Sequence, residues 1–322
     1  GTYSNCSITV ADSAGNTQII TVNSFTIDTI APILSQVTAI TSPTNDNTSS
    51  YTFSSTEAGS ITYGGSCSSS TTTSTTDNNT VTFNALSDGT YSNCKISVTD
   101  DASNISDNLS VNSFTIDTVK PILAQVTAVT TPTNDTTPGY SFSSDEAGTI
   151  SYGGSSCSPG GTSAIDGTNS ISFGTLSEGS YSCTITVTDS AENASSALSA
   201  NTFVIDTTAP TVSSISSSTS DGAYKLDDNI TVTVTFDENV IVDNSSGNPR
   251  IQLETGTNDR YATYISGNST SILSFLYTVQ SGDNSSDLGY KSSDSLFVNS
   301  GTIRDNATND ATLTLFSPNQ SG

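Results

Sequence analysis

The stretch CTITVTD, residues 183–189, decides the fold class of this chain. Its residues Cys183, Ile185 and Val187 alternate with threonines, which is the period-two pattern of a strand with one buried and one exposed face. Threonine suits the exposed face because its branched side chain favours extended backbone. The stretch ITVTVTF, residues 230–236, has the same pattern, and no segment of useful length has helical spacing. The sequence therefore predicts an all-β protein.

The alternating segments belong to a long internal repeat. The words NSFTIDTIAP (23–32), NSFTIDTVKP (112–121) and NTFVIDTTAP (201–210) end in Pro32, Pro121 and Pro210, so the period is 121 − 32 = 89 and 210 − 121 = 89 residues. This length fits a small independent domain better than a solenoid unit. We expect four parts: the last two strands of an incomplete domain (1–31), two complete repeats (32–119 and 120–208) and a divergent domain without cysteine (209–322).

Each complete repeat has room for about seven short strands. In the first one, strands are predicted over 33–40, 51–55, 60–64, 81–86, 91–98 and 109–116. The segments between them, such as SPTND, EAG, LSDG and DDASN, are rich in Gly, Pro, Asn and Asp, which favour turns. The pattern predicts end-to-end Greek-key β-sandwiches of the immunoglobulin type.

Cysteines occupy equivalent places in the repeats. Cys67 and Cys94 lie in one copy, and Cys157 and Cys183 in the next. Cys94 and Cys183 share the apolar face of a predicted strand, so we expect two buried disulfides, Cys67–Cys94 and Cys157–Cys183, with free buried thiols as the alternative. Disulfides indicate an oxidising compartment outside the cytoplasm. Cys6 matches Cys94 and Cys183, and its partner is expected upstream of Gly1.

The words IDTTAP (205–210) and TDSAEN (188–193) resemble the bacterial Ig-like (Big) repeats of giant cell-surface adhesins. The segment from residue 210 is similar to a second, cysteine-free repeat type of such proteins. The resemblance implies an extracellular, cell-surface location, neighbouring repeats in a longer chain and mostly a spacer role. Tyr181 precedes Cys183 by two residues, like the tyrosine corner of immunoglobulins. Cys67 departs from the immunoglobulin pattern because it follows the strand predicted over 60–64.

The linker aspartates predict metal sites. In a seven-stranded sandwich the last strand ends against loops of the next domain, and these loops carry Glu57, Glu146 or Glu238 and a D-x-A-x-N turn, which occurs at 12–16, 100–104, 189–193 and 305–309. The expected ligand groups are Asp28 with Glu57, Asp100, Asp101 and Asn104; Asp117 with Glu146, Asp189 and Asn193; and Asp206 with Glu238, Asp305 and Asn309. Such hard oxygen ligands favour Ca²⁺, whereas the alternative is that these residues only form turns and end strands.

The charge balance excludes several partners. The chain has 31 acidic and 7 basic residues, a net charge of −24, which disfavours nucleic acids and anionic membranes. It has no apolar run near the length of about 18 residues that a membrane-spanning helix needs. With no histidine, and with its acids at joints between repeats, we expect it not to be an enzyme.

Three functions remain open at this stage. The first is an extracellular stalk or fibre segment of a surface adhesin that calcium stiffens between repeats. The second is an adhesive module in 209–322 that recognises a glycan or protein, although alternation places several of its tyrosines, Tyr261, Tyr264, Tyr277 and Tyr290, in the core. The third is a self-assembling filament subunit in which strands of one chain complete the sandwich of another.

Overall fold

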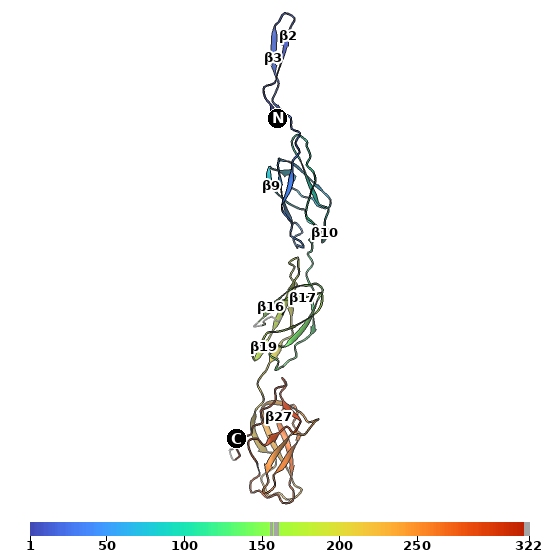
Figure 1. Cartoon of the computed structure of the whole chain (residues 1–322). Coiled ribbons are helices and arrows are strands. Elements are labelled where there is room, and N and C mark those ends of the chain that lie inside the picture. The colour runs from blue at the N-terminus through green and yellow to red at the C-terminus, as the bar shows by residue number, and fades with distance from the viewer. Residues whose placement is uncertain (155–156, 158–160, 319–322) are drawn as a thin grey trace. The chain divides into compact units, whose positions relative to one another are not determined.

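The computed structural model describes residues 1–154, 157 and 161–318 (Figure 1). The secondary structure of these residues consists of strands, as the alternating pattern predicts. In the same residues there is no helix with the length and apolar character that crossing a membrane requires. The chain divides into two compact units, residues 1–122 with 145–149 and 187–196, and residues 123–144 with 150–186 and 197–322.

The first complete repeat is a sandwich of two antiparallel sheets. One sheet has the order β5–β6–β9 and the other β12–β11–β7–β8, while β10 pairs with β13. The strands are β5 (Leu34–Thr38), β6 (Ser50–Ser55), β7 (Gly59–Gly64), β8 (Thr73–Ser74), β9 (Asp77–Thr82), β10 (Gly89–Tyr91), β11 (Lys95–Thr99), β12 (Leu109–Ser110) and β13 (Phe114–Ile116). This order confirms the predicted β-sandwich.

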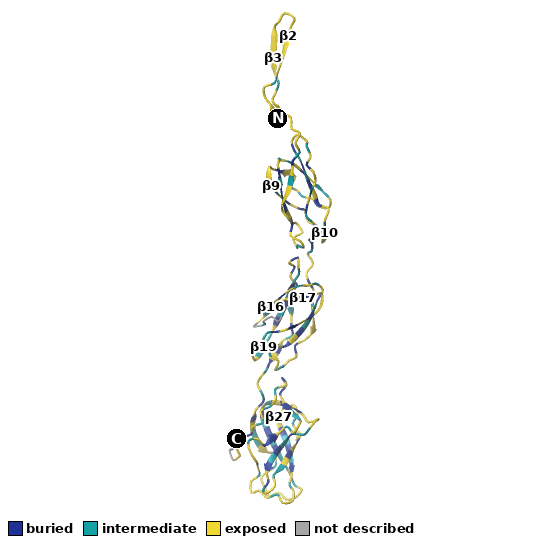
Figure 2. Cartoon of the chain, in the orientation of Figure 1, coloured by how far each residue is buried: buried dark blue, intermediate teal, exposed yellow. Residues whose placement is uncertain are grey.

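The core lies between the two sheets because apolar and polar residues alternate along each strand. Tyr51 and Phe53 of β6 pack in one cluster with Ile96 and Val98 of β11, and all four are fully buried (Figure 2). On the outer face the threonine hydroxyls pair across strands, as in the 2.9 Å hydrogen bond between the hydroxyls of Thr52 and Thr80. Outward threonines thus stabilise the sheet instead of loosening the chain.

Both predicted disulfides are present. Cys67 follows β7 and Cys94 precedes β11, which are neighbouring antiparallel strands, and the two Cα atoms are 5.2 Å apart. Cys157 and Cys183 make the equivalent bridge, with Cα atoms 5.8 Å apart. The bridge therefore joins strands within one sheet and does not cross between sheets as in antibody domains.

The tyrosine corner is present in both complete repeats. The Tyr91 hydroxyl donates a 2.8 Å hydrogen bond to the carbonyl of Ser87, and the Tyr181 hydroxyl makes the same bond to Ser177.

The strand predicted over 109–116 is broken into β12 and β13. Between them Asn112 accepts a hydrogen bond from the Ile40 N–H at 3.0 Å and donates one to the Ile40 carbonyl at 2.9 Å. Because this side chain replaces backbone pairing, β12 stays with β11 while β13 pairs with β10. A period-two pattern does not reveal such a side-chain interruption.

The second repeat has the same sheets, β14–β15–β18, β17–β16–β20–β21 and β19–β22. Its strands are β14 (Leu123–Thr127), β15 (Gly139–Ser144), β16 (Gly148–Gly154), β17 (Ser163–Ala164), β18 (Gly167–Ser172), β19 (Gly179–Tyr181), β20 (Cys183–Thr188), β21 (Leu198–Ser199) and β22 (Phe203–Ile205). Ahead of the first repeat lies a hairpin in which β2 pairs with β3 and β1 pairs with β4. Its strands are β1 (Thr2–Tyr3), β2 (Ser7–Ala11), β3 (Thr17–Thr21) and β4 (Phe25–Thr26).

The last domain is built differently, around one sheet of eight strands. Its order is β23–β24–β27–β26–β25–β28, with β29 on β25 and β30 on the second half of β24. The strands are β23 (Val212–Ser217), β24 (Asn229–Asp243), β25 (Arg250–Glu254), β26 (Arg260–Ser266), β27 (Thr270–Thr278), β28 (Gly289–Tyr290), β29 (Leu296–Phe297) and β30 (Thr302–Arg304). Tyr264 and Tyr277 are buried in its core, as alternation predicts, whereas Tyr261 is exposed.

Candidate metal centres

The D-x-A-x-N turns share one hydrogen-bonded geometry. After β11, Asp100 Oδ1 accepts hydrogen bonds from the backbone N–H groups of Ala102 and Asn104, and Asp100 Oδ2 accepts one from the Asn104 side-chain amide, all at 2.8 Å. The same carboxylate–amide bond occurs in Asp12–Asn16, Asp189–Asn193 and Asp305–Asn309. The residue before each asparagine has a positive φ: Gly15, Ser103, Glu192 and Thr308. The pattern thus holds one carboxylate firmly at the start of the turn.

The asparagine also fastens each turn to the preceding linker. Asn104 Nδ2 lies 3.3 Å from the carbonyl oxygen of Asp28, Asn193 Nδ2 2.9 Å from that of Asp117, and Asn309 Nδ2 2.8 Å from that of Asp206. Because the amide nitrogen donates both of its bonds here, the nitrogen and not the oxygen faces the acidic residues. The structure therefore gives these asparagines a positioning role, and metal binding through their amide oxygens stays a prediction.

A glycine brings each of the first two glutamates to its turn. A Cβ atom on Gly59 would lie 2.2 Å from the carbonyl oxygen of Thr99, and one on Gly148 would lie 2.3 Å from that of Thr188. Only glycine lets the first residue of β7 or β16 approach the end of the neighbouring strand so closely. The Glu-Ala-Gly motifs at 57–59 and 146–148 therefore place Glu57 beside Asp100 and Glu146 beside Asp189.

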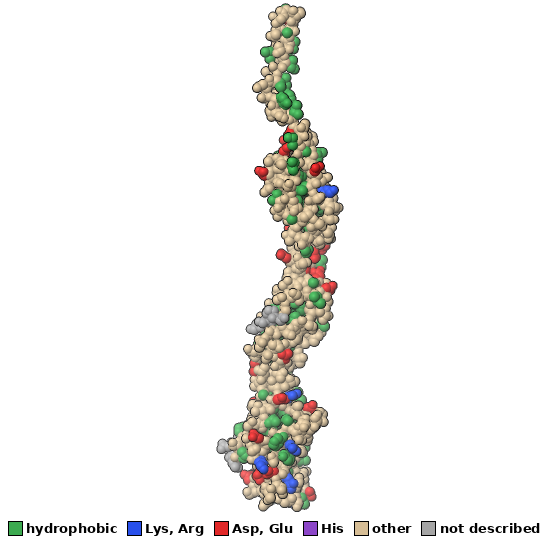
Figure 3. All heavy atoms as spheres, viewed as in Figure 1, with side chains coloured by type: hydrophobic (Ala, Val, Ile, Leu, Met, Phe, Trp, Pro, Cys, Tyr) green, Lys and Arg blue, Asp and Glu red, His purple; other side chains and the backbone are tan. Residues whose placement is uncertain are grey.

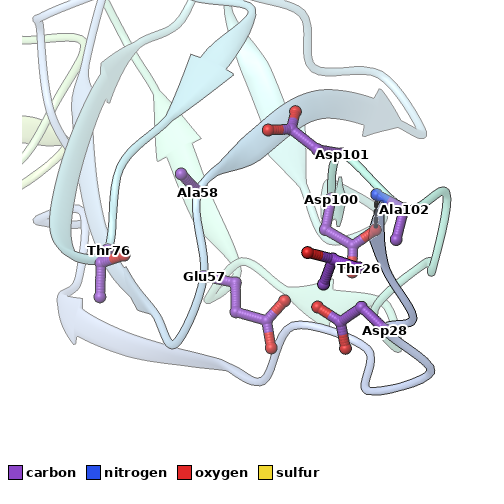
Figure 4. Close-up of a pocket in the computed structure, with 8 residues that line it drawn as sticks. All are labelled: Thr26, Asp28, Glu57, Ala58, Thr76, Asp100, Asp101 and Ala102. Atoms are coloured by element: carbon purple, nitrogen blue, oxygen red, sulfur yellow. Dashed lines mark hydrogen bonds between the residues drawn. The ribbon is translucent and has the colours of Figure 1, made fainter. Parts of the chain in front are cut away.

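Within the described part of the chain three acidic clusters result, and each joins a linker aspartate to two loops of the following domain. They are Asp28–Glu57–Asp100, Asp117–Glu146–Asp189 and Asp206–Glu238–Asp305, each with one carboxylate oxygen per residue within 4.8 Å of the others. The first two lie in one compact unit and the third in the other. The carboxylates of Asp28 and Glu57 face the same space as that of Asp100, while Asp101 points away from them (Figure 4).

Burial, together with neighbouring negative charges, raises the pKa of all three glutamates. Burial, followed by the charges of Asp28 and Asp100, raises the pKa of Glu57. Burial and the clustered aspartates likewise raise the pKa of Glu146 and of Glu238. In contrast, the hydrogen bond from Asn104 is the main cause that lowers the pKa of Asp100. Each of these glutamates therefore holds a proton more readily than an isolated glutamate does.

The clusters fit a calcium ion. Oxygens that bind one Ca²⁺ at about 2.5 Å lie at most about 5 Å from each other, which the 4.8 Å limit satisfies. All three side chains in each cluster are carboxylates, which are hard oxygen ligands. Ca²⁺ prefers such ligands, whereas soft transition metals do not. Asp305 in the third cluster is only 2 % exposed, so a cation would also offset a buried charge.

The raised pKa values predict that calcium reverses the pH dependence of stability. Without calcium, the folded protein binds protons at Glu57, Glu146 and Glu238 more tightly than the unfolded chain, so acidification from neutrality toward their raised pKa values should stabilise it. With calcium bound the same acidification should destabilise the protein, because protons displace the cation. Thermal unfolding at several pH values, with calcium and with chelator, measures both slopes. Equal slopes in the two series would contradict the assignment, and replacing all three glutamates with glutamine should remove the difference.

Sequence reasoning missed two sets of contacts at these sites. The backbone N–H of Asn45 donates a 3.1 Å hydrogen bond to the carbonyl of Ala191, and that of Asn134 does the same to Ala307. The TND words of the loops at 44–46 and 133–135 thus touch the next D-x-A-x-N turn. Asp237, next to Glu238, accepts hydrogen bonds from Thr211 and adds charge beside the third cluster. The adjacent acidic residues Asp237 and Glu238 were the signal in the sequence that indicated additional charge at this cluster.

No protein-family model matches this chain, and neither does any curated protein. Among solved structures, it is similar to fibronectin(III)-like modules of Clostridium thermocellum CbhA, with 11% identity, 54% of this chain and 94% of that chain covered, and a TM-score of 0.33. It is similar to invasin, a bacterial integrin-binding protein, with 12% identity, coverage of 77% and 57%, and a TM-score of 0.26. It is also similar to the extracellular region of plexin A4, with 12% identity, 79% of this chain and 23% of that chain covered, and a TM-score of 0.22.

None of these similarities assigns a function to the chain. The sheets themselves show tandem β-sandwich domains in an all-β chain. The resemblance to the Big repeats of giant adhesins is a prediction beyond that coarser result. The predicted domain boundaries also stay predictions.

Proposed function

We propose that this chain is a segment of an extracellular surface stalk whose repeats are held to one another by calcium ions. The observation that carries the proposal is the repetition of one acidic cluster at three successive linkers. A site that served only one domain would not need an aspartate from the linker before it. Cross-linking the linker to two loops of the next domain restricts bending, which is what a spacer requires.

The hydrogen bonds around each cluster support the same role. They already join linker and turn, through Asn193 to the Asp117 carbonyl in the second cluster and through Asn309 to the Asp206 carbonyl in the third. A cation would bind the three carboxylates beside this existing contact and cancel their repulsion. The two disulfides are typical of proteins that fold outside the reducing cytosol, which supports the extracellular location.

Small-angle scattering and calorimetry with and without a chelator test this function. We expect three calcium ions per chain, and we expect chelation to broaden the distribution of conformations without unfolding the sandwiches, whose cores and disulfides lie elsewhere. Asp117→Ala should bind two ions and increase flexibility in calcium, because one cluster loses its linker ligand.

The matched control is Asp107→Ala, which removes an exposed acid outside the clusters. It should leave both the stoichiometry and the scattering profile unchanged. The same scattering profile with and without chelator in the unmodified chain would overturn the stalk proposal, as would three bound ions in Asp117→Ala.

A second candidate function rests on one surface of the last domain. The guanidinium of Arg250 lies 4.1 Å from the ring centroid of Tyr261, and Tyr261 is in an edge-on contact with Phe297. Both aromatic side chains are more than one third exposed. Exposed aromatics beside a cation suit a glycan or a protein ligand. Binding of 209–322 to a glycan array, lost in Tyr261→Ala, would favour an adhesive module. We propose no catalytic role.

A further inference from the structure

The outer face of the sheet in the last domain carries an arginine between two aromatic rings. The register pairs Arg250 of β25 with Phe297 of β29 on one side and with Thr263 of β26 on the other. Ile251, the next residue along β25, is completely buried in the core, so Arg250 and the residues paired with it point outward. Tyr261, two residues before Thr263, lies on the same face. We call Arg250, Tyr261 and Phe297 the aromatic–arginine surface.

The two rings hold the guanidinium in place and remain open to a ligand. The guanidinium carbon of Arg250 lies 4.1 Å from the centroid of the Tyr261 ring. The ring centroids of Tyr261 and Phe297 are 6.4 Å apart, with the ring planes at 69°. Tyr261 is 39% exposed and Phe297 is 37% exposed. Stacking on an aromatic ring fixes a guanidinium, and exposed tyrosine and arginine side chains are typical of binding surfaces.

Arg250 differs from the other two arginines because it has no anionic partner. Arg260 Nε lies 2.9 Å from Asp283 Oδ1. Arg304 Nε lies 2.6 Å from Asp310 Oδ1. In the part of the chain that the structure describes, Arg250 makes no ion pair, and its Nε atom is buried without a hydrogen-bond partner. A partly desolvated cation without a partner is costly, so an external anion would offset this cost.

Polar side chains beside Tyr261 can bind hydroxyl groups. Gln252 lies opposite Tyr261 in the register, and its Nε2 atom is 3.4 Å from Asp259 Oδ2. Lys291 pairs with the same oxygen of Asp259. An amide, a carboxylate and an ammonium group next to one ring supply both donors and acceptors of hydrogen bonds. A ligand with a carboxylate and several hydroxyl groups therefore suits this face.

The charge of the whole chain limits how acidic the ligand can be. A net charge of −24 repels polyanions, including acidic peptides and heavily sulfated glycans. Figure 3 shows basic side chains on the last domain, and five of the seven basic residues belong to residues 209–322, namely Lys225, Arg250, Arg260, Lys291 and Arg304. A ligand with a single carboxylate on an otherwise neutral body gains the contact with Arg250 and experiences the least repulsion.

We propose that the aromatic–arginine surface binds a glycan that ends in a hexuronic acid. The carboxylate pairs with the Arg250 guanidinium, and the C–H face of the sugar ring contacts Phe297 and Tyr261. In a hexuronic acid the carboxylate is attached to the sugar ring itself, so one ring makes both contacts. The sugar hydroxyls reach Gln252 and Asp259. This inference rests on the second candidate function, whose ligand it names, and not on the calcium clusters.

Two oligosaccharides that differ in one group test the proposal. One ends in glucuronate and the other in glucose, and each is titrated calorimetrically into the 1–322 chain. We expect the glucuronate form to bind at least about tenfold more tightly, because a carboxylate forms charge-assisted hydrogen bonds with the guanidinium. The preference should shrink as the salt concentration rises, since salt screens exposed charges.

Variants of the surface separate the carboxylate contact from the ring contact. Arg250→Gln should abolish the preference for glucuronate and leave the affinity for the glucose form unchanged. Tyr261→Ala should weaken the binding of both oligosaccharides. Arg304→Gln, at an exposed arginine of the same domain that is paired with Asp310, is the matched control and should change neither affinity. If Arg250→Gln lowers the unfolding midpoint of the domain, Arg250→Lys serves instead, and it should reduce the preference because lysine lacks the planar fork.

The outcomes distinguish this ligand from the adhesive module itself. Equal binding of the two oligosaccharides by the unmodified chain would overturn the acidic ligand and leave an adhesive module for neutral glycans. A preference for glucuronate that persists in Arg250→Gln would overturn the role of Arg250. Tighter binding of a sialylated glycan or of an acidic peptide would overturn the hexuronic acid. Absence of binding to either oligosaccharide would also overturn it, whereas the stalk proposal is tested separately by scattering with and without calcium.

Discussion

Phe203→Ala should lower the free energy of unfolding of the second repeat by about 3–5 kcal/mol. The Phe203 ring is completely buried, and its centroid lies 5.7 Å from those of Phe173 and Tyr181. A loss of this size is a large part of the 5–15 kcal/mol that stabilises a typical domain. Because β22 ends one residue before Asp206, calcium binding at the third cluster should weaken as well. Amide exchange of β22 and calcium titration measure the two effects.

Phe25→Ala is the matched control, since Phe25 in NSFTID (23–28) aligns with Phe203 in NTFVID (201–206) but lies in β4 of the N-terminal hairpin, where it is 43% exposed. It stacks on Tyr3 with ring centroids 5.2 Å apart, but it has no covering sheet. The expected loss in the free energy of unfolding of the hairpin is therefore about 1 kcal/mol or less, which is the contribution of an exposed aromatic pair. Equal losses at the two positions would show that Phe203 is not buried as described.

Replacing Cys157 and Cys183 together with alanine should lower the stability of the second repeat by about 3 kcal/mol. The bridge closes a loop with a sequence separation of 26 residues, and it restricts mainly the unfolded chain. A domain of roughly 90 residues buries a limited core, so such a cross-link matters. Denaturant unfolding monitored by amide exchange in β20 measures the change.

The last domain is an internal control for this prediction. It contains no cysteine, so its unfolding midpoint should be the same in the double variant, and the same with and without reductant. A parallel shift in both domains would mean that the loss comes from coupling between domains rather than from loop closure.

The fold class was predictable because burial imposes a pattern on the sequence. Ile185 and Val187 face inward and the threonines between them face outward, so alternation alone indicates the strands. The break between β12 and β13 was not predictable, since it depends on one side chain, Asn112, that bonds to the distant backbone of Ile40. The single continuous sheet of the last domain was equally hidden, because it depends on which strands become neighbours.

The candidate sites were predictable to the level of which loops meet. Topology brings the linker aspartate to the glutamate loop and to the D-x-A-x-N turn, and the carboxylates converge in each of the three cases. The orientation of the Asn104 side chain was not predictable, because the sequence does not tell which amide atom faces the cluster. Nor does the sequence separate Asp101 from Asp100, although Asp101 points away.

The disulfide within one sheet has a mechanical consequence. Strands β8, β9 and β10 lie between Cys67 and Cys94, which are 27 residues apart in sequence. When a load on the two ends of the repeat has unfolded it, the covalent path runs from β7 through the sulfur–sulfur bond to β11, so the chain between the two cysteines bears no tension. An unfolding repeat would then release about 90 Å less length than an uncrosslinked one, at roughly 3.4 Å per residue. The bridge therefore limits how far each repeat extends before covalent bonds carry the force.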